Sequence, residues 1–360
     1  MRVLIAGGGT GGHLYPGIAV AEELRRRDAA TEVSFVGTAR GLESRVVPAL
    51  GYPLDVIRSA GLKGKALGAL ARGLALLPLS AVDAWRVISR RRPDVVVGVG
   101  GYSSGPVLLL AAMRRIPTLL MEQNTAPGFT NRTLARWVGA AAVSYEETLR
   151  YFPRIGVLTG NPVRREFLDR AGRDAPPGDG RTHVLIVGGS QGARAVNDAM
   201  LAAAPALAAH AAALTITHQT GERDLARVRD GYVAAGCVAV AEPFFHDMHA
   251  RMTAADVVVS RAGASTLAEL TILGKPMVLV PLPSAADDHQ RKNAATLAGA
   301  GAAEVIEERE LDGTRMATTV LALVADASRR QRMASAARAL GRPDAAARVV
   351  DRLEQLAGGR

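Results

Sequence analysis

Cysteine, aromatic residues and long apolar runs are all scarce in this chain of 360 residues. The single cysteine, Cys237, excludes an internal disulfide framework and a cysteine-rich metal site. Aromatic residues make up 4% of the chain, which disfavours a nucleic-acid surface built from exposed stacking rings. Arg72 and Pro78 interrupt the apolar stretch 66–82, and no run reaches the roughly 20 residues that span a bilayer. We therefore expect a soluble cytoplasmic chain without a secretion signal.

Negative charge is the scarcer sign, since 34 acidic residues against 44 lysines and arginines give a formal net charge of +10. The excess concentrates between Arg58 and Arg92, where eight basic residues accompany one acid, Asp83. The same stretch carries leucines at helical spacing. An apolar face rimmed by cations is typical of a helix lying on an anionic lipid surface. A core-facing helix with solvated arginines would give the same pattern, so periodicity alone leaves both interpretations open.

Apolar strand-like segments alternate with helical ones, and the alternation starts twice, near residue 3 and near residue 183. This pattern is typical of parallel sheets covered by helices on both faces, so we expect two Rossmann-like doubly wound α/β domains. A turn at 160–162 and a Pro- and Gly-rich stretch at 171–181 mark the boundary. The predicted domains are residues 1–162 and 163–342, followed by a helix in 343–360 that the pattern could attach to either. The expected strands are 3–6, 32–36, 93–99, 118–121, 182–187, 215–218, 256–260 and 277–280.

Three glycine-rich loops, residues 6–13, 188–194 and 260–269, follow predicted strands and open predicted helices. Glycine lets the backbone approach a ligand closely, and the N–H groups at a helix N-terminus attract anions. Ligands of open parallel sheets bind at the carboxyl ends of the strands, so three such loops predict an anion site. Ser190 could donate to a phosphate or act only as a helix N-cap. Glu269 could accept two ribose hydroxyls or act only as a favourable first-turn acid.

The first loop also satisfies the G-x-G-x-x-G pattern of dinucleotide-binding proteins. That interpretation requires a ribose-binding acid at the end of the second strand, which instead ends Phe35-Val36-Gly37-Thr38. A loop that merely packs a helix on a strand is the other alternative. His13 at the start of the helix favours a functional site, because a packing turn does not need an imidazole there.

Six motifs together resemble the MurG family of peptidoglycan glycosyltransferases, which add N-acetylglucosamine (GlcNAc) to a lipid-linked muramyl-pentapeptide. They are Gly-Gly-Thr-Gly-Gly-His (8–13), Gly-Gly-Tyr-Ser-Ser-Gly-Pro (100–106), Glu-Gln-Asn (122–124), Gly-Asn-Pro-Val-Arg (160–164), Gly-Gly-Ser-Gln-Gly-Ala-Arg (188–194) and Ser-Arg-Ala-Gly-Ala-Ser-Thr-Leu-Ala-Glu (260–269). Each is weak alone, but jointly they are specific. The resemblance implies the GT-B fold, in which two Rossmann-like domains face each other across a cleft. It assigns the acceptor and the membrane to the N-terminal domain and UDP-GlcNAc to the C-terminal domain, with the last helix returning to the N-terminal one.

The same resemblance implies which residues bind the substrates. Residues at the glycine loops would hold the sugar and diphosphate, the backbone of Phe245 would read the uracil, and Gln290 would bind sugar hydroxyls. Phe245 stands where the family often has an aliphatic residue, and Met121 precedes Glu122 where a histidine is common. The complete predicted binding set is Thr10, Gly11, Gly12, Asn124, Arg164, Ser190, Phe245, Ala264, Ser265, Thr266, Leu267, Ala268, Glu269 and Gln290.

The family reaction, from an α-linked donor to a β-1,4 product, implies one in-line attack by the acceptor 4-hydroxyl. A base should take the hydroxyl proton, and His13 and Glu122 are the two candidates. Helix N-termini and Arg164 could stabilise the leaving UDP electrostatically. The sequence has no Asp-x-Asp pair at the end of a predicted strand, and Asp287 and Asp288 are adjacent, so their side chains tend to diverge. We therefore expect no obligatory metal and no cofactor.

The lipid acceptor that the resemblance implies makes a membrane anchor the preferred interpretation of residues 61–92. The expected location is the cytoplasmic face of the plasma (inner) membrane, as a peripheral protein. Two alternatives remain. The first is a different enzyme, either another GT-B UDP-sugar transferase or a UDP-GlcNAc epimerase. The second is a non-enzymatic basic module that binds nucleic acid. The absence of a recognisable DNA or RNA motif disfavours the last, so we expect no nucleic-acid partner.

Overall fold

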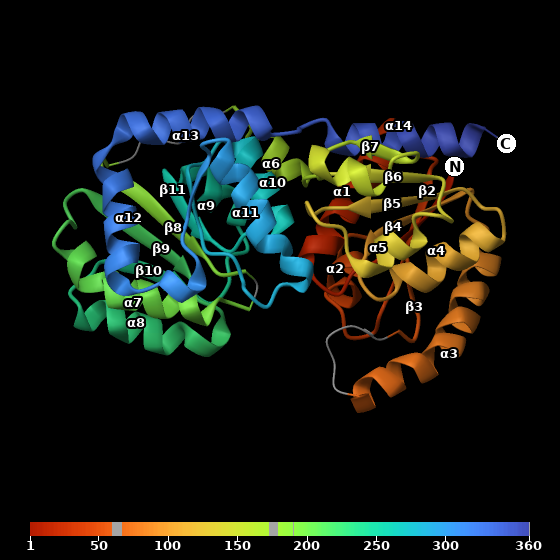
Figure 1. Cartoon of the computed structure of the whole chain (residues 1–360), viewed down its shortest axis with the longest axis horizontal. Helices are drawn as coiled ribbons and strands as arrows, with labels where there is room; N and C mark the ends of the chain where they lie inside the picture. Colours follow the sequence, from red (N-terminus) through yellow and green to blue (C-terminus); the bar gives the residue numbers. More distant parts are fainter. Residues whose placement is uncertain (60–66, 173–178, 190, 360) are drawn as a thin grey trace. The chain divides into compact units, whose positions relative to one another are not determined.

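The computed structural model describes residues 1–59, 67–172, 179–189 and 191–359, with the backbone alone for 67–75 and 77 (Figure 1). The chain forms two compact units. The first is Met1–Arg165 together with Arg342–Arg360, and the second is Glu166–Gly341. None of the described helices combines the length and apolar character needed to cross a membrane.

The first unit is built on a seven-stranded parallel sheet in the order β3-β2-β1-β4-β5-β6-β7. Its strands are β1 (Arg2–Gly7), β2 (Glu32–Gly37), β3 (Leu54–Val56), β4 (Val95–Gly100), β5 (Thr118–Glu122), β6 (Ala140–Val143) and β7 (Gly156–Leu158). Its helices are α1 (Gly11–Arg27), α2 (Glu43–Ala49), α3 (Leu67–Arg91), α4 (Ser104–Met113), α5 (Phe129–Leu134), the 3-10 helix η1 (Glu146–Tyr151) and α14 (Ala345–Gly358).

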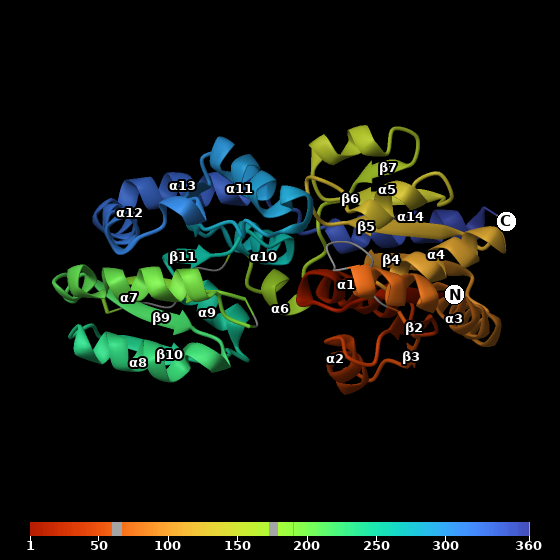
Figure 2. The same cartoon turned by 60° about the horizontal axis from the view of Figure 1, so that its bottom comes forward.

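Both faces of this sheet are buried. Val3 and Ile5 of β1 pack with α1 and α14, whereas Leu4 and Ala6 pack with α3, α4 and α5 on the opposite face. Successive side chains of a strand point to opposite faces, so a run of apolar residues is the expected sequence for a doubly covered strand. Figure 2 shows the sheet between these helices.

The second unit has a six-stranded parallel sheet in the order β10-β9-β8-β11-β12-β13. Its strands are β8 (Thr182–Val187), β9 (Leu214–Gln219), β10 (Ala239–Glu242), β11 (Val257–Ser260), β12 (Met277–Leu279) and β13 (Ala303–Val305). Its helices are α7 (Arg194–Ala208), η2 (Glu222–Asp224), α8 (Leu225–Ala234), α9 (Met248–Ala254), α10 (Ala264–Leu273), η3 (Ala286–Asp288), α11 (His289–Gly299), η4 (Glu308–Glu310), α12 (Gly313–Ala325) and α13 (Ala327–Leu340), and the short α6 (Arg165–Leu168) begins at the boundary. One face of the sheet forms a core with α7, α8 and α12.

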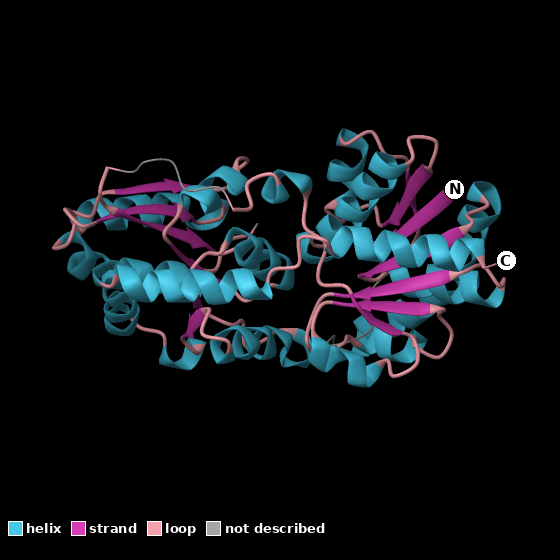
Figure 3. Cartoon of the chain, turned by 90° about the horizontal axis from the view of Figure 1, so that it is seen from above, coloured by secondary structure: helices cyan, strands magenta, loops and turns pink. Residues whose placement is uncertain are grey.

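Figure 3 shows the strands of each unit together with the helices that cover them. Both sheets reverse their strand order beside the first strand, between β1 and β4 and between β8 and β11. At such a reversal, the loops that follow the two strands run in opposite directions. A crevice therefore opens between these loops at the carboxyl edge of the sheet. The fold therefore directs attention to the loops after β1 and β4 in the first unit, and after β8 and β11 in the second.

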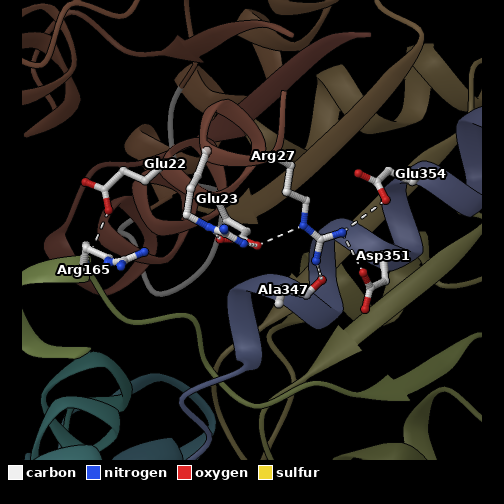
Figure 4. Close-up of polar contacts among 8 residues, drawn as sticks. Glu22, Glu23, Arg27, Arg165, Ala347, Asp351 and Glu354 are labelled. Carbon is white, nitrogen blue, oxygen red and sulfur yellow. Dashed lines mark hydrogen bonds and ion pairs between the residues drawn. The ribbon is translucent and has the colours of Figure 1, made fainter. Parts of the chain in front are cut away.

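The last helix, α14, packs on α1 (Figure 4). Arg27 at the end of α1 is held by Glu23 and donates to Asp351 Oδ1 at 2.7 Å and to the Ala347 carbonyl at 3.0 Å. Val349, Val350 and Leu353 of α14 are fully buried in the core shared with α1. The end of the chain thus completes one face of the first sheet.

Candidate functional site

In the first unit, the loops after β1 and β4 interlock through glycine backbones. The Gly8 N–H donates to the Gly100 carbonyl at 3.2 Å. A Cβ built on Gly101 would lie 2.4 Å from the Gly8 carbonyl oxygen, and Gly101 has φ +82°. A side chain at this position would separate the two loops, so glycine sets their close approach.

His13 lies in the first turn of α1, against this pair of loops. It is half-buried, and a Cβ built on Gly100 would lie 2.6 Å from its Nδ1 atom. The carbonyl of Thr10 accepts from the N–H groups of His13 and Leu14 at 3.2 and 3.1 Å, which starts the helix. The predicted residues Thr10, Gly11, Gly12 and His13 therefore lie together at the carboxyl edge of the first sheet.

A buried carboxylate that sequence reasoning missed fills the first glycine loop. Glu43, from the first turn of α2, is 1% exposed and accepts from the Gly9 N–H at 2.6 Å. Its other oxygen accepts from the N–H and hydroxyl of Thr38 at 2.8 and 3.0 Å. A Cβ at Gly41 would lie within 2.3 Å of this carboxylate. In the sequence, Glu43 has only the appearance of an ordinary first-turn acid.

Glu122, one of the two candidate bases, ends β5 and is 3% exposed. One oxygen accepts from Asn131 Nδ2 at 2.8 Å and the Gly128 N–H at 3.1 Å. The other accepts from the backbone and side-chain nitrogens of Asn124 at 3.1 and 3.3 Å. Burial raises the pKa of Glu122, while hydrogen bonds from Asn131, Asn124 and Gly128 oppose that rise. This geometry holds the loop after β5 and orients Asn124.

Arg164 belongs to the first unit, although the sequence placed it in the donor-binding domain. Its guanidinium lies 4.1 Å from the centre of the Tyr15 ring on α1, within the range of a cation–π interaction. The next residue, Arg165, donates its N–H to Glu22 at 3.4 Å (Figure 4). Helix α1 thus carries the candidate His13 at one end and positions Arg164 along its side.

In the second unit, the loop after β8 turns sharply before α7. A Cβ built on Gly192 would lie 2.0 Å from the Thr220 carbonyl, and Gly192 has φ +74°. Asn197 of α7 donates to the same carbonyl at 2.9 Å. The loop is therefore packed tightly against the end of β9. The predicted site residue Ser190 lies outside the described residues.

The loop after β11 opens α10 with Gly263 as the N-cap. The first turn is formed by the predicted run Ala264–Ala268, and the Leu267 N–H donates to the Gly263 carbonyl at 3.0 Å. Glu269 is the sixth residue of α10 and is 7% exposed, so it lies beyond the first turn and is not the first-turn acid that the sequence allowed. The positive end of the α10 dipole therefore lies beside the switch point between β8 and β11, where an anion is favoured.

Two further predicted residues lie on neighbouring loops. Phe245, after β10, is 1% exposed, with the Arg251 guanidinium 4.5 Å from its ring centre and its N–H donating to Gln219 Oε1 at 3.1 Å. Gln290, in the first turn of α11, accepts from the Leu282 N–H at 3.0 Å. This bond orients the Gln290 amide so that its nitrogen is the end that could donate to a sugar hydroxyl.

The structure thus places the described members of the predicted set in two groups, each at the carboxyl edge of its own sheet. Within the described part of the chain, no three His, Cys, Asp or Glu side chains gather closely enough to hold a metal ion. Three buried residues that the sequence did not reveal, Glu43, Asn131 and Gln219, hydrogen-bond to predicted residues or to the loops that carry them.

Comparison with known proteins defines the class. Residues 3–143 match the Glycosyltransferase family 28 N-terminal domain, and residues 183–349 match the Glycosyltransferase family 28 C-terminal domain. Together with the two parallel sheets, these matches define a family 28 glycosyltransferase of the GT-B fold, which confirms the predicted fold class.

Within that class, the chain belongs to the MurG family, as its motifs predicted. A relative from Anaeromyxobacter sp. (strain Fw109-5) is 50% identical over 352 residues, covering 98% of this chain and 92% of the relative. A relative from Myxococcus xanthus is 48% identical with the same coverage. Both are named UDP-N-acetylglucosamine–N-acetylmuramyl-(pentapeptide) pyrophosphoryl-undecaprenol N-acetylglucosamine transferase.

Solved structures agree. The crystal structure of Acinetobacter baumannii MurG superimposes with a TM-score of 0.79 at 31% identity, covering 98% of this chain and 99% of that one. A UDP-GlcNAc 2-epimerase from Neisseria meningitidis superimposes with a TM-score of 0.67 at 14% identity, covering 99% and 100%. The second likeness concerns the fold alone.

Proposed function

We propose that this enzyme transfers GlcNAc from UDP-GlcNAc to the 4-hydroxyl of MurNAc in undecaprenyl-pyrophosphoryl-MurNAc-pentapeptide, with inversion at the anomeric carbon. The observation that carries the proposal is the 50% identity to a transferase of that name over 98% of the chain. The product would be the lipid-linked disaccharide used in peptidoglycan synthesis.

The second unit supplies most of the proposed donor contacts. The N-terminus of α10 would hold the diphosphate through its N–H groups and dipole, and Glu269 would accept the ribose hydroxyls. The Phe245 backbone would read the uracil, while Gln290 and Asn124 would bind the sugar. Tyr15 holds the Arg164 guanidinium in place, and Arg164 would stabilise the charge that develops on the leaving UDP.

His13 is the proposed base. In the reaction the acceptor oxygen forms a bond to C1 of GlcNAc, the bond from C1 to the UDP oxygen breaks, and UDP leaves with the electron pair. The acceptor proton would pass to the His13 imidazole, since a neutral imidazole nitrogen can accept a proton and His13 lies against the loops after β1 and β4. Glu122 is better suited to orienting Asn124, because Asn131, Asn124 and Gly128 donate to its buried carboxylate.

A transfer assay tests the proposed function. With radiolabelled UDP-GlcNAc, the lipid-linked muramyl-pentapeptide and EDTA, we expect label to move into the lipid phase. Transfer that requires added magnesium would keep the function and contradict the metal-free prediction. If a folded protein that binds UDP-GlcNAc transferred nothing in either condition, the acceptor assignment would be wrong, and release of the sugar without a lipid acceptor would indicate an epimerase.

We also propose that the face carrying α3, α4 and α5 binds an anionic membrane surface, which would make the protein peripheral at the cytoplasmic face of the inner membrane. Val82 and Trp85 of α3 are 45% and 52% exposed, and Met113 and Trp137 nearby in the fold are more than half exposed. The Arg114 guanidinium lies 4.6 Å from the Trp85 ring centre. Apolar side chains mixed with cations favour such a surface. Residues 61–66 of the predicted anchor, and the side chains of residues 67–75 and 77 with the leucines at helical spacing, lie outside the described part of the chain.

Charging this face is expected to release the protein from vesicles. The double variant Val82→Glu, Trp85→Glu should co-sediment with anionic vesicles about tenfold less than the native chain, because it removes apolar area and adds repulsive charge. The matched control is Val233→Glu, Val238→Glu, which charges two exposed valines of the second unit. Equal co-sedimentation of a folded double variant and the native chain would show that this face is not the attachment surface.

A further inference from the structure

One buried side chain, Gln219, connects two loops of the second unit. It is the last residue of β9, between β8 and β10 in the sheet, and is 1% exposed. Its Nε2 donates to the Gly189 carbonyl at 2.9 Å, and its Oε1 accepts from the Phe245 N–H at 3.1 Å. The glycine loop after β8 and the loop after β10 are therefore joined through one amide group.

The two bonds fix the orientation of that amide. Turning it over would place an NH₂ group against the Phe245 N–H and a carbonyl against the Gly189 carbonyl, so both contacts would become repulsive. The neighbouring residue, His218, points to the other face of the sheet and bonds to Asn197 and Tyr232. Burial lowers the pKa of His218 to about 3, so these bonds are made by a neutral imidazole. The end of β9 is thus anchored on both faces.

The strand end itself is tied to only one of the two loops by backbone bonds among the described residues. Thr220 and Gly221 donate to the carbonyls of Glu242 and Pro243 at 3.0 and 3.1 Å, which joins β9 to the β10 side. On the β8 side, the Gln219 amide holds Gly189, whose φ of +87° belongs to the left-handed region. A change at Gln219 would therefore act on the spacing between the loops rather than on the strand pairing.

We infer that Gln219 is a positioning residue for the nucleotide, one that sets the distance between the loop beside the phosphates and the loop that reads the base. This inference rests on the proposed UDP-GlcNAc site. Uridine diphosphate would contact both loops at once. A fixed spacing between the loops therefore lowers the entropic cost of ordering them when the nucleotide binds. A ligand that contacts the base loop alone gains nothing from the fixed spacing.

The test compares UDP with uridine. In Gln219→Met, which keeps the side-chain length and removes both bonds, the Kd for UDP should rise about tenfold, because the two loops must then be ordered when UDP binds. The inhibition constant for uridine should stay within about twofold of the native value, because uridine does not span the two loops. The KM for UDP-GlcNAc should rise with the Kd, while kcat at saturating donor stays close to native.

Two further variants complete the experiment. Gln219→Glu keeps an acceptor for the Phe245 N–H but places a carboxylate oxygen against the Gly189 carbonyl, so its Kd for UDP should rise at least as much as that of Gln219→Met. Gln331→Met changes an exposed glutamine of α13 and should leave all constants unchanged. Thermal unfolding of each variant monitors the fold, and Gln219→Glu supplies the measurement if Gln219→Met does not fold.

The outcomes separate the two proposals. If the native chain does not bind UDP, the proposed function is wrong. If the native chain binds UDP and folded Gln219→Met binds it equally well, Gln219 does not position the nucleotide. If UDP and uridine weaken by the same factor, Gln219 supports base recognition alone and the spacing role is overturned.

Discussion

The His13→Ala variant is expected to lose transfer activity by a factor of about 10² to 10⁴ in kcat, the usual contribution of a general base. UDP-GlcNAc affinity should change little, because the principal proposed donor contacts belong to the second unit and His13 belongs to the first. The measurement is kcat from the lipid transfer assay alongside the Kd of UDP-GlcNAc from calorimetry. The matched control is His210→Ala, which removes an exposed histidine after α7.

The pH dependence adds a second readout. If the His13 imidazole takes the proton, kcat/KM of the native enzyme should decrease at acidic pH, because a protonated ring cannot accept a proton, and the remaining activity of His13→Ala should lack that decrease. Near-native kcat in His13→Ala would remove His13 as the base. A loss of donor affinity equal to the loss of rate would instead indicate that His13 holds a substrate.

The Glu43→Ala variant is expected to lower the free energy of unfolding by about 3–5 kcal/mol, since it removes a buried acceptor from three donors. The Gly9 N–H and the two donors of Thr38 would lose their acceptor, and the space of the buried carboxylate would be left empty. Activity should fall as well, because Glu43 holds the loop that leads to His13. Urea unfolding and kcat measured on the same preparations check both parts.

Two comparisons sharpen this prediction. Glu43→Gln keeps the volume but turns an NH₂ group toward one of the donors, so its stability should lie between the native and alanine values. Glu147→Ala, at an exposed glutamate of the same unit, should change stability by less than about 0.5 kcal/mol. A Glu43→Ala protein as stable as this control would contradict the view that the carboxylate supports the first glycine loop.

The central strands were predictable because their signals are local. Val95-Val96-Val97 in β4 is an uninterrupted β-branched run, and a glycine exit follows it. The outer strands were not found by the sequence reasoning. Strand β6 reads Ala140-Ala141-Ala142-Val143, and alanine favours helix by intrinsic propensity. Its extended form comes from pairing with β5 on one side and β7 on the other.

Some features of the candidate site were visible in the sequence, and others depend on tertiary contacts. The glycine loops, His13 and the opening of α10 were visible in the sequence, because each is a short motif at a strand-to-helix junction. Their roles toward substrate stay predictions. The burial of Glu122 among amide donors and the stacking of Arg164 on Tyr15 were not visible, since both depend on contacts with residues from other elements.

By itself, the sequence determined the α/β class, the two-fold repetition of strand, glycine loop and helix, and the family. The tertiary structure alone decided that Glu43 fills the first glycine loop and that Gln219 joins the loops beside Gly189 and Phe245. The physical reason is that the apolar pattern of a strand or helix, and the glycine loop that joins them, are local in the sequence. The order of strands in the sheet brings together residues whose separation along the chain carries no periodic signal.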